Sequence, residues 1–193
     1  MQGVVYYLTG MGGRLNAGLG QALLSRGLLV KGRELVGEFS KLEFQQKIDL
    51  IAEDLQTKFW HKDARVIANS FGAYLFLHAQ AQFERYVGKV LLLSPIVGEF
   101  ANEEMMMGFI PPRSQRLAEL IRGGKFNSPA HCEMHVGSKD WQSNPNAVRQ
   151  VGEAMGAAVH ILEDAGHSLP KSYVNNTLDN WLLEEKFLVH HRQ

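Results

Sequence analysis

The chain has 193 residues, enough for one domain with a sizeable hydrophobic core, and we expect a single domain over residues 1–193. Basic and acidic residues are balanced at 20 each, which argues against nucleic acid or an anionic membrane and favours a small neutral molecule or a protein as partner. Cys132 is the only cysteine, so we expect no internal disulfide. The sequence has neither a signal-peptide pattern nor an apolar run of the roughly 18 to 20 residues that span a membrane. We therefore expect a soluble, cytoplasmic protein.

Apolar β-type runs alternate with helical patterns along the whole chain. This alternation predicts an α/β fold, a three-layer αβα sandwich around a mostly parallel six-stranded sheet. Several of the runs are apolar at consecutive positions, as are strands that a parallel sheet buries on both faces. The predicted strands are residues 4–9, 34–39, 65–69, 89–94, 132–136 and 159–163.

Three helices are indicated by their start signals or by their apolar spacing. Ser40 and Glu43 have the spacing of a capping box, and apolar residues recur at helical spacing over residues 44–59. The Asn-Pro pair at 144–145 predicts the start of another helix, with proline at the first helical position. Residues 173–182 have the pattern of a last amphipathic helix.

Residues 97–129 interrupt this alternation, because the interval is longer than an ordinary connection between a strand and a helix. It contains a predicted short helix over residues 115–121 and three methionines at 105–107, which would give a loop an adaptable apolar face. We expect this segment to cover an active site. The alternative is a helix packed on the sheet with a mobile loop before it.

The stretch ANSFG, residues 68–72, joins the third predicted strand to a helical stretch over residues 71–84 that begins almost entirely apolar. It is one residue short of the G-x-S-x-G nucleophile elbow, because Ala68 stands where the first glycine should be. The sharp turn crowds the residues two before and two after the nucleophile, and Ala68 and Gly72 are both small. Ser70 is therefore a predicted nucleophile; the alternative is a serine that only caps the helix.

Two further residues follow later strands, in the order serine, acid, histidine that belongs with a serine on a strand-to-helix turn. Asp140 comes just after the fifth predicted strand, and His167 follows the sixth. Gly166 gives the loop before His167 the backbone flexibility to orient the imidazole ring. Both lie at the carboxyl ends of strands, where open α/β sheets place their ligand chemistry. A serine attacks a carbonyl well only if a base takes its proton and a third group orients that base, and these residues supply both.

Each of these assignments has a plainer alternative. Asp140 taken alone is an ordinary turn aspartate, and Asp164 competes with it for the acid role, although a separate loop gives Asp140 the better approach to the imidazole. A lone loop histidine such as His167 is usually only solvated. Among the other histidines, His78 falls in the buried helical stretch, His131 precedes a strand, His135 and His160 lie within strands, and His61, His190 and His191 have the pattern of surface residues.

At these residues the sequence resembles the α/β-hydrolase superfamily, and the resemblance covers nearly the whole chain. It rests on ANSFG for the elbow, VGSKD for the acid loop, AGHS for the histidine loop and LTGMGG after the first strand. The last part of the chain also looks like small bacterial esterase-like serine hydrolases and the retinoblastoma-binding type. Six strands instead of the usual eight imply a trimmed α/β-hydrolase fold. Ala68 and Thr9 depart from the glycine and histidine of many members.

The resemblance implies that the glycine-rich loop supplies an oxyanion hole, with the backbone N–H groups of Met11 and Phe71 as its two donors. The alternative is a dinucleotide-binding loop of the pattern G-x-G-x-x-G, with Glu38 as its ribose-binding acid. That pattern fails at Leu15, which stands where the third glycine belongs. Neither a Walker pattern nor a metal-binding pattern occurs, so we expect no cofactor and no metal site.

Together these residues predict a carboxylesterase-like serine hydrolase that cleaves a small ester, thioester or amide through a Ser-His-Asp triad and an acyl-enzyme. In this hypothesis Ser70 attacks, His167 moves the proton and Asp140 orients the imidazole. The alternative is a hydrolase-like binding or regulatory module with little or no turnover, which Ala68, Thr9 and the small size suggest. A small-molecule acyl substrate is expected, whose identity the sequence leaves open, as it does the oligomeric state.

Overall fold

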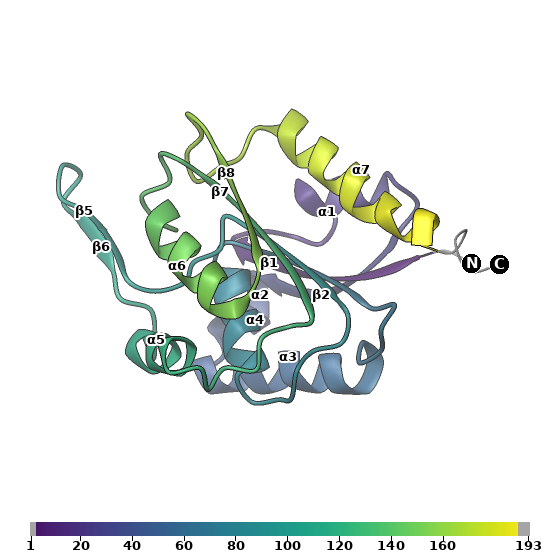
Figure 1. The fold of residues 1–193 in the computed structure, drawn as a ribbon, viewed down its shortest axis with the longest axis horizontal. Coiled ribbons are helices and arrows are strands. Elements are labelled where there is room, and N and C mark those ends of the chain that lie inside the picture. The colour runs from purple at the N-terminus through teal and green to yellow at the C-terminus, as the bar shows by residue number, and fades with distance from the viewer. Residues whose placement is uncertain (1–2, 189–193) are drawn as a thin grey trace.

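The computed structural model describes residues 3–188, with side chains described as far as residue 183. Its main sheet consists of β1 (Val4–Met11), β2 (Leu29–Leu35), β3 (Arg65–Asn69), β4 (Lys89–Leu93), β7 (His131–Gly137) and β8 (Ala158–Leu162). The strand order is β2-β1-β3-β4-β7-β8, and every neighbouring pair is parallel (Figure 1). This confirms the predicted α/β class and the six-stranded sheet.

Helices cover both faces of this sheet, which gives the predicted three layers (Figure 1). One face is covered by α1 (Leu19–Leu24) and α7 (Lys171–Leu188), and the other by α3 (Phe44–Lys58), α4 (Phe71–Gln80), α5 (Ser114–Arg122) and α6 (Pro145–Met155). Side chains alternate along β1, so Val5 and Tyr7 join the core under α1 and α7, whereas Tyr6 and Leu8 join the larger core under α3 and α4. The strand β1 is thereby packed on both faces.

The predicted strand at residues 34–39 is wrong. The strand β2 ends at Leu35, and the residues after it form a short helix, α2 (Gly37–Lys41). Because β2 lies at the edge of the sheet and carries polar residues such as Lys31 and Arg33, it lacks the apolar run that marks the buried strands. The other five strands were predicted to within two residues at each end.

Helix α3 is capped by Glu43 rather than by Ser40. The Glu43 side chain accepts the backbone N–H of Gln46, and the Gln46 side chain accepts the backbone N–H of Glu43 at 3.0 Å. Ser40 instead donates its hydroxyl to the carbonyl of Gly37 in α2. The predicted helix itself is confirmed as α3. The start of α6 is also confirmed, because Asn144 accepts two backbone N–H groups of its first turn.

Residues 97–129 contain an antiparallel hairpin that the sequence did not reveal, in which β5 (Phe100–Asn102) pairs with β6 (Met107–Phe109). The hairpin projects away from the main sheet (Figure 1). Met105, Met106 and Met107 are exposed at its tip, to 56%, 92% and 52%. The predicted short helix is confirmed as α5. That the segment covers an active site stays a prediction.

The bounds of two other helices, α4 and α7, differ from those predicted from the sequence. The helix α4 ends at residue 80, four residues earlier than predicted, and α7 begins at residue 171. Among the helices of residues 3–188, none combines the length and the apolar character that crossing a lipid bilayer requires. A location in the cytoplasm stays a prediction.

Candidate active site

Ser70 lies in a strained turn between β3 and α4. Its φ is +52° and its ψ is −119°, a conformation that costs a non-glycine residue about 1 to 3 kcal/mol. The turn is fixed from both sides, since the Ser70 N–H donates to the carbonyl of Leu93 and its carbonyl accepts the N–H of Ile96. Gly72 brings α4 against β1 so closely that a Cβ atom there would lie 2.4 Å from the Thr9 carbonyl oxygen. This is the strand–turn–helix geometry that the elbow motif requires.

The Ser70 side chain points to His167 and not back into its own helix. Its Oγ lies 2.8 Å from Nε2 of His167, and it makes no capping hydrogen bond to the backbone of α4. The alternative of a serine that only caps its helix is therefore wrong. His167 lies in the loop after β8, where its own carbonyl accepts the hydroxyl of Ser94 at 2.7 Å. The imidazole is thus held beside the serine by its main chain.

Asp140 contacts the other nitrogen of the His167 ring. Its two carboxylate oxygens lie 3.0 and 2.9 Å from Nδ1, and the fully buried carboxylate also accepts the N–H groups of Gln142 and Ser143. Burial alone would raise the pKa of the Asp140 carboxyl, but the hydrogen bonds from His167 and Ser143 outweigh it and lower that pKa below its ordinary value. A carboxylate in this setting stays ionised at neutral pH and orients the ring.

The competing residues lie elsewhere. Asp164, the alternative acid, is exposed and forms an ion pair with Lys139 at 2.6 Å. Of the other histidines, His78 is buried in α4 and His61 is exposed, both as predicted, whereas His131 is the first residue of β7 instead of preceding it. His190 and His191 lie outside the described residues. Serine, histidine and aspartate therefore meet in the combination that the chain order predicted.

Solved structures share the fold of this chain over nearly its whole length. The alpha/beta hydrolase domain-containing protein 10 from mouse matches with a TM-score of 0.67 at 12% identity, covering 94% of this chain and 90% of that one. Est1E from Butyrivibrio proteoclasticus matches with a TM-score of 0.66 at 12% identity, covering 95% and 88%. The chain has the α/β-hydrolase fold. The ydeN gene product of B. subtilis has a TM-score of 0.62 at 15% identity, over 94% of this chain and 99% of that one.

The match is one of fold, since no protein-family model and no curated protein sequence matches the chain. It confirms the trimmed α/β-hydrolase fold that the sequence motifs implied. The reaction of this chain has to be inferred from the residues of the site, because proteins with the same fold have many different functions.

In this α/β-hydrolase fold the glycine-rich loop and the start of α4 meet at the serine. Gly10 is so close that a Cβ atom there would lie 3.2 Å from Cβ of Ser70. Phe71 is the first residue of α4, so its N–H is one of the N-terminal groups that a helix leaves without a partner of its own. Met11 and Phe71 both line the same cavity as Ser70. Their role as oxyanion donors stays a prediction.

Thr9, where many superfamily members carry histidine, holds this loop to the neighbouring strand. Its fully buried Oγ accepts the N–H of Leu35 at 2.9 Å and donates to the carbonyl of Gly10 at 3.0 Å or of Gly13 at 3.2 Å. A hydroxyl accepts and donates at once, which suits this junction between β1, β2 and the loop. The departure at this position therefore has a structural reason.

The dinucleotide-binding interpretation of the loop is not favoured. Such a loop opens its helix directly, whereas α1 begins at Leu19, six residues after Gly13. Glu38, the proposed ribose-binding acid, lies in α2 with its side chain 92% exposed and paired to Lys41. Neither feature resembles a nucleotide site.

A cavity of about 1200 Å³ opens beside Ser70 and His167. Its walls come from the start of α1, the start of α7 and the hairpin of β5 and β6. The hairpin contributes Phe100 and Phe109, whose ring centroids lie 5.6 Å apart. The apolar lining includes Leu19, Ala22, Ile96, Phe100, Phe109, Leu169 and Val174. An apolar group of substantial size therefore fits beside the serine.

Sequence reasoning missed two serines that support this site. Ser94 directly follows β4 and has a φ of +44°. Its backbone N–H donates to the carbonyl of His135, and its hydroxyl donates to the carbonyl of His167. The Ser143 N–H donates to Asp140, and the Ser143 Oγ lies 3.4 Å from Nδ1 of His167. Neither serine belongs to a motif. The one available signal was that Ser94 stands at the carboxyl end of a strand.

Proposed function

We propose that the chain is a serine hydrolase of carboxylesterase-like type, acting on a small ester, thioester or amide. The observation that carries the proposal is a chain of two hydrogen-bond contacts. The Ser70 Oγ lies 2.8 Å from Nε2 of His167, and Nδ1 of the same ring lies 2.9 Å from Asp140. These are the contacts that an activated nucleophile, its base and the group orienting that base require. The strained turn at Ser70 supports the same interpretation.

His167 accepts and donates the transferred proton in both halves of the reaction. Neutral His167 donates its Nδ1–H to Asp140, which leaves Nε2 free to take the proton of Ser70 as the oxygen attacks the acyl carbon. The resulting imidazolium is stabilised by the ionised carboxylate of Asp140. It gives its proton to the leaving group, and water then hydrolyses the acyl-enzyme by the same path in reverse.

Negative charge on the carbonyl oxygen is stabilised by backbone N–H groups. In the proposal these belong to Phe71, at the N-terminus of α4, and to Met11, at the end of β1. Both lie in the cavity wall next to Ser70, and loss of one such donor typically costs about 10² to 10³ in rate. The hydrolysis needs only these groups and water.

The cavity supports an apolar acyl group as the part of the substrate that is bound. Phe100 and Phe109 bring the hairpin to the cavity wall, so residues 97–129 would act as its cover. The exposed Met105, Met106 and Met107 lie outside the lining, so the apolar character of the site comes from its aromatic and aliphatic lining residues instead. Phe71 adds a third ring, 6.2 Å from that of Phe109.

A series of p-nitrophenyl esters of increasing acyl length tests the proposal. The wild-type chain is expected to hydrolyse them, with kcat/KM rising while added methylenes fill the cavity, by up to a few-fold for each one. Ser70→Ala is expected to lose at least about 10³ of this activity while keeping its fold. Equal rates for the two proteins would reject the triad and favour a binding module that uses the same cavity without turnover.

A further inference from the structure

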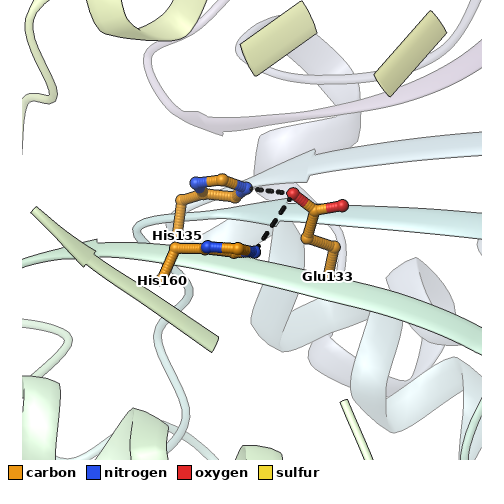
Figure 2. A group of neighbouring side chains, drawn as sticks. All are labelled: Glu133, His135 and His160. Atoms are coloured by element: carbon orange, nitrogen blue, oxygen red, sulfur yellow. Dashed lines mark hydrogen bonds and ion pairs between the residues drawn. The ribbon is translucent and has the colours of Figure 1, made fainter. Parts of the chain in front are cut away.

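A second group of side chains with chemical potential lies on strands β7 and β8. Figure 2 shows Glu133, His135 and His160 pointing toward one another. The Oε1 atom of Glu133 lies 2.6 Å from Nε2 of His135 and 3.4 Å from Nε2 of His160. All three ligand atoms lie within 4.8 Å of one another. Two imidazole nitrogens and a carboxylate oxygen are the donor set that three-ligand Zn²⁺ sites use.

We propose that Glu133, His135 and His160 bind a Zn²⁺ ion at this edge of the sheet. The site is independent of the proposed hydrolase reaction. It differs from the expectation, drawn from the sequence, that the chain has no metal site. In a tetrahedral site with bonds of about 2.1 Å the ligand atoms stand about 3.4 Å apart, and the distance from Glu133 to His160 already has this value. A fourth position, open to solvent, would hold water.

The register of the sheet creates this site. His135 and His160 are directly paired residues of two parallel strands, so their rings stack with centroids 4.5 Å apart and planes within 15°. Glu133 lies two residues before His135 and therefore on the same face of β7. The ligand set is built on two strands, which hold it more precisely than loops would.

Binding requires two small movements, one of Glu133 and one of His160, and the side chains of both residues are at least partly exposed to solvent. The Glu133 oxygen must withdraw from His135 by somewhat under 1 Å, and its side chain is 26% exposed. The His160 ring must tilt out of the stack so that its lone pair points at the ion, and its side chain is 50% exposed. His135 is buried and stays in place, which leaves one fixed ligand and two adjustable ones.

A further contact supports the buried ligand. The Nδ1 atom of His135 lies 2.6 Å from the hydroxyl of Tyr173 in α7. Metal-binding histidines commonly donate their second ring N–H to an oxygen acceptor, which fixes the tautomer and the ring orientation. When Nε2 of His135 binds Zn²⁺, the single hydrogen of the neutral ring lies on Nδ1, where the Tyr173 oxygen can accept it. The ion would thus tie β7, β8 and α7 together.

Calorimetric titration of the chelator-treated full chain with Zn²⁺ tests the proposal. We expect one ion per chain, and an affinity that falls at least about tenfold in Glu133→Gln and in His160→Ala. Both substitutions avoid the buried His135, so the fold should survive, which circular dichroism checks. His131→Ala removes an exposed histidine from the start of the same strand and should bind as the wild type does. Ser70→Ala should also bind unchanged.

Thermal unfolding gives a second readout. Excess Zn²⁺ should raise the Tm of the wild type and of His131→Ala by more than that of His160→Ala, since a ligand stabilises the folded state in proportion to the logarithm of its binding. No calorimetric binding to the wild type would overturn the proposal. So would equal affinities in Glu133→Gln and the wild type, or a loss in His131→Ala as large as that in His160→Ala.

Discussion

Ser70 is held at a φ of +52° although it is not glycine, and the hydrogen bonds on both sides of its peptide keep it there. Folding therefore stabilises a conformation that the residue itself disfavours. Such strain is found where a side chain must be presented in one direction, and here that direction is toward Nε2 of His167. The strain makes a prediction about stability that is separate from catalysis.

Replacing Ser70 by glycine should stabilise the protein, because glycine adopts a positive φ without strain. We expect Ser70→Gly to unfold at a higher urea concentration than Ser70→Ala, by about 1 kcal/mol in the free energy of unfolding. Both variants lack the hydroxyl, so the comparison isolates the backbone. If Ser70→Gly is the less stable of the two, the turn is not strained.

His78 makes a second residue-scale prediction. It is buried in α4, and its Nε2 atom has no hydrogen-bond partner among the described residues. Burial, with smaller contributions from Arg113 and Arg116, lowers the pKa of His78 to about 4. In the unfolded chain the value is about 6.5, so the unfolded state binds more protons between these pH values. The contribution of His78 to stability is complete above pH 6.5 and is lost as the pH falls toward 4.

His78→Leu should remove this acid sensitivity. Between pH 6.5 and 4 the wild type should lose on the order of 2 kcal/mol of unfolding free energy more than the variant does. Urea unfolding of both proteins at several pH values measures the difference. Parallel stability curves for the two proteins would show that the imidazole is not buried in its neutral form.

At the scale of elements, the contact between α4 and β1 positions the nucleophile. A Cβ atom at Gly72 would lie 2.4 Å from the carbonyl oxygen of Thr9 and 2.5 Å from that of Leu8, so the helix would have to move off the strand. Ala68, on the other side of the serine, is fully buried in β3 and tolerates its methyl group. The two small residues of the elbow are therefore not equivalent.

Gly72→Ala should cost at least about 2 kcal/mol of stability and should also reduce the reactivity of Ser70, because α4 begins directly after the serine and carries the Phe71 N–H. Ala68→Gly is the matched change: it removes a methyl group and should cost about 1 kcal/mol while the serine keeps its reactivity. Urea unfolding and ester hydrolysis measure both effects. A Gly72→Ala variant as active and stable as the wild type would contradict this view of the contact.

At the scale of the whole molecule, the sequence predicted what strong local signals determine. The buried strands were recognisable because they are apolar at consecutive positions, as in residues 90–93 of β4. The convergence of Ser70, Asp140 and His167 was predictable because all three follow strands whose carboxyl ends share one edge of the sheet.

The rest depended on contacts that local sequence does not encode. The edge strand β2 is polar where the inner strands are apolar, and the strands β5 and β6 have three residues each, too few for a periodic signal. The neighbourhood of His135 and His160 depends on the register between β7 and β8, which no motif specifies. Ser94 likewise supports His167 across 73 residues of sequence.

The central claim is that Ser70, activated by His167, is the nucleophile. A fluorophosphonate probe followed by mass spectrometry of the labelled peptides tests it most directly. We predict one label per chain, on Ser70. The label should be lost in Ser70→Ala and should form at least about 10³ more slowly in His167→Ala. It should be retained in the control Ser128→Ala, which changes a serine outside the cavity lining. An unlabelled but folded wild type, or a label that persists in Ser70→Ala, would contradict the claim.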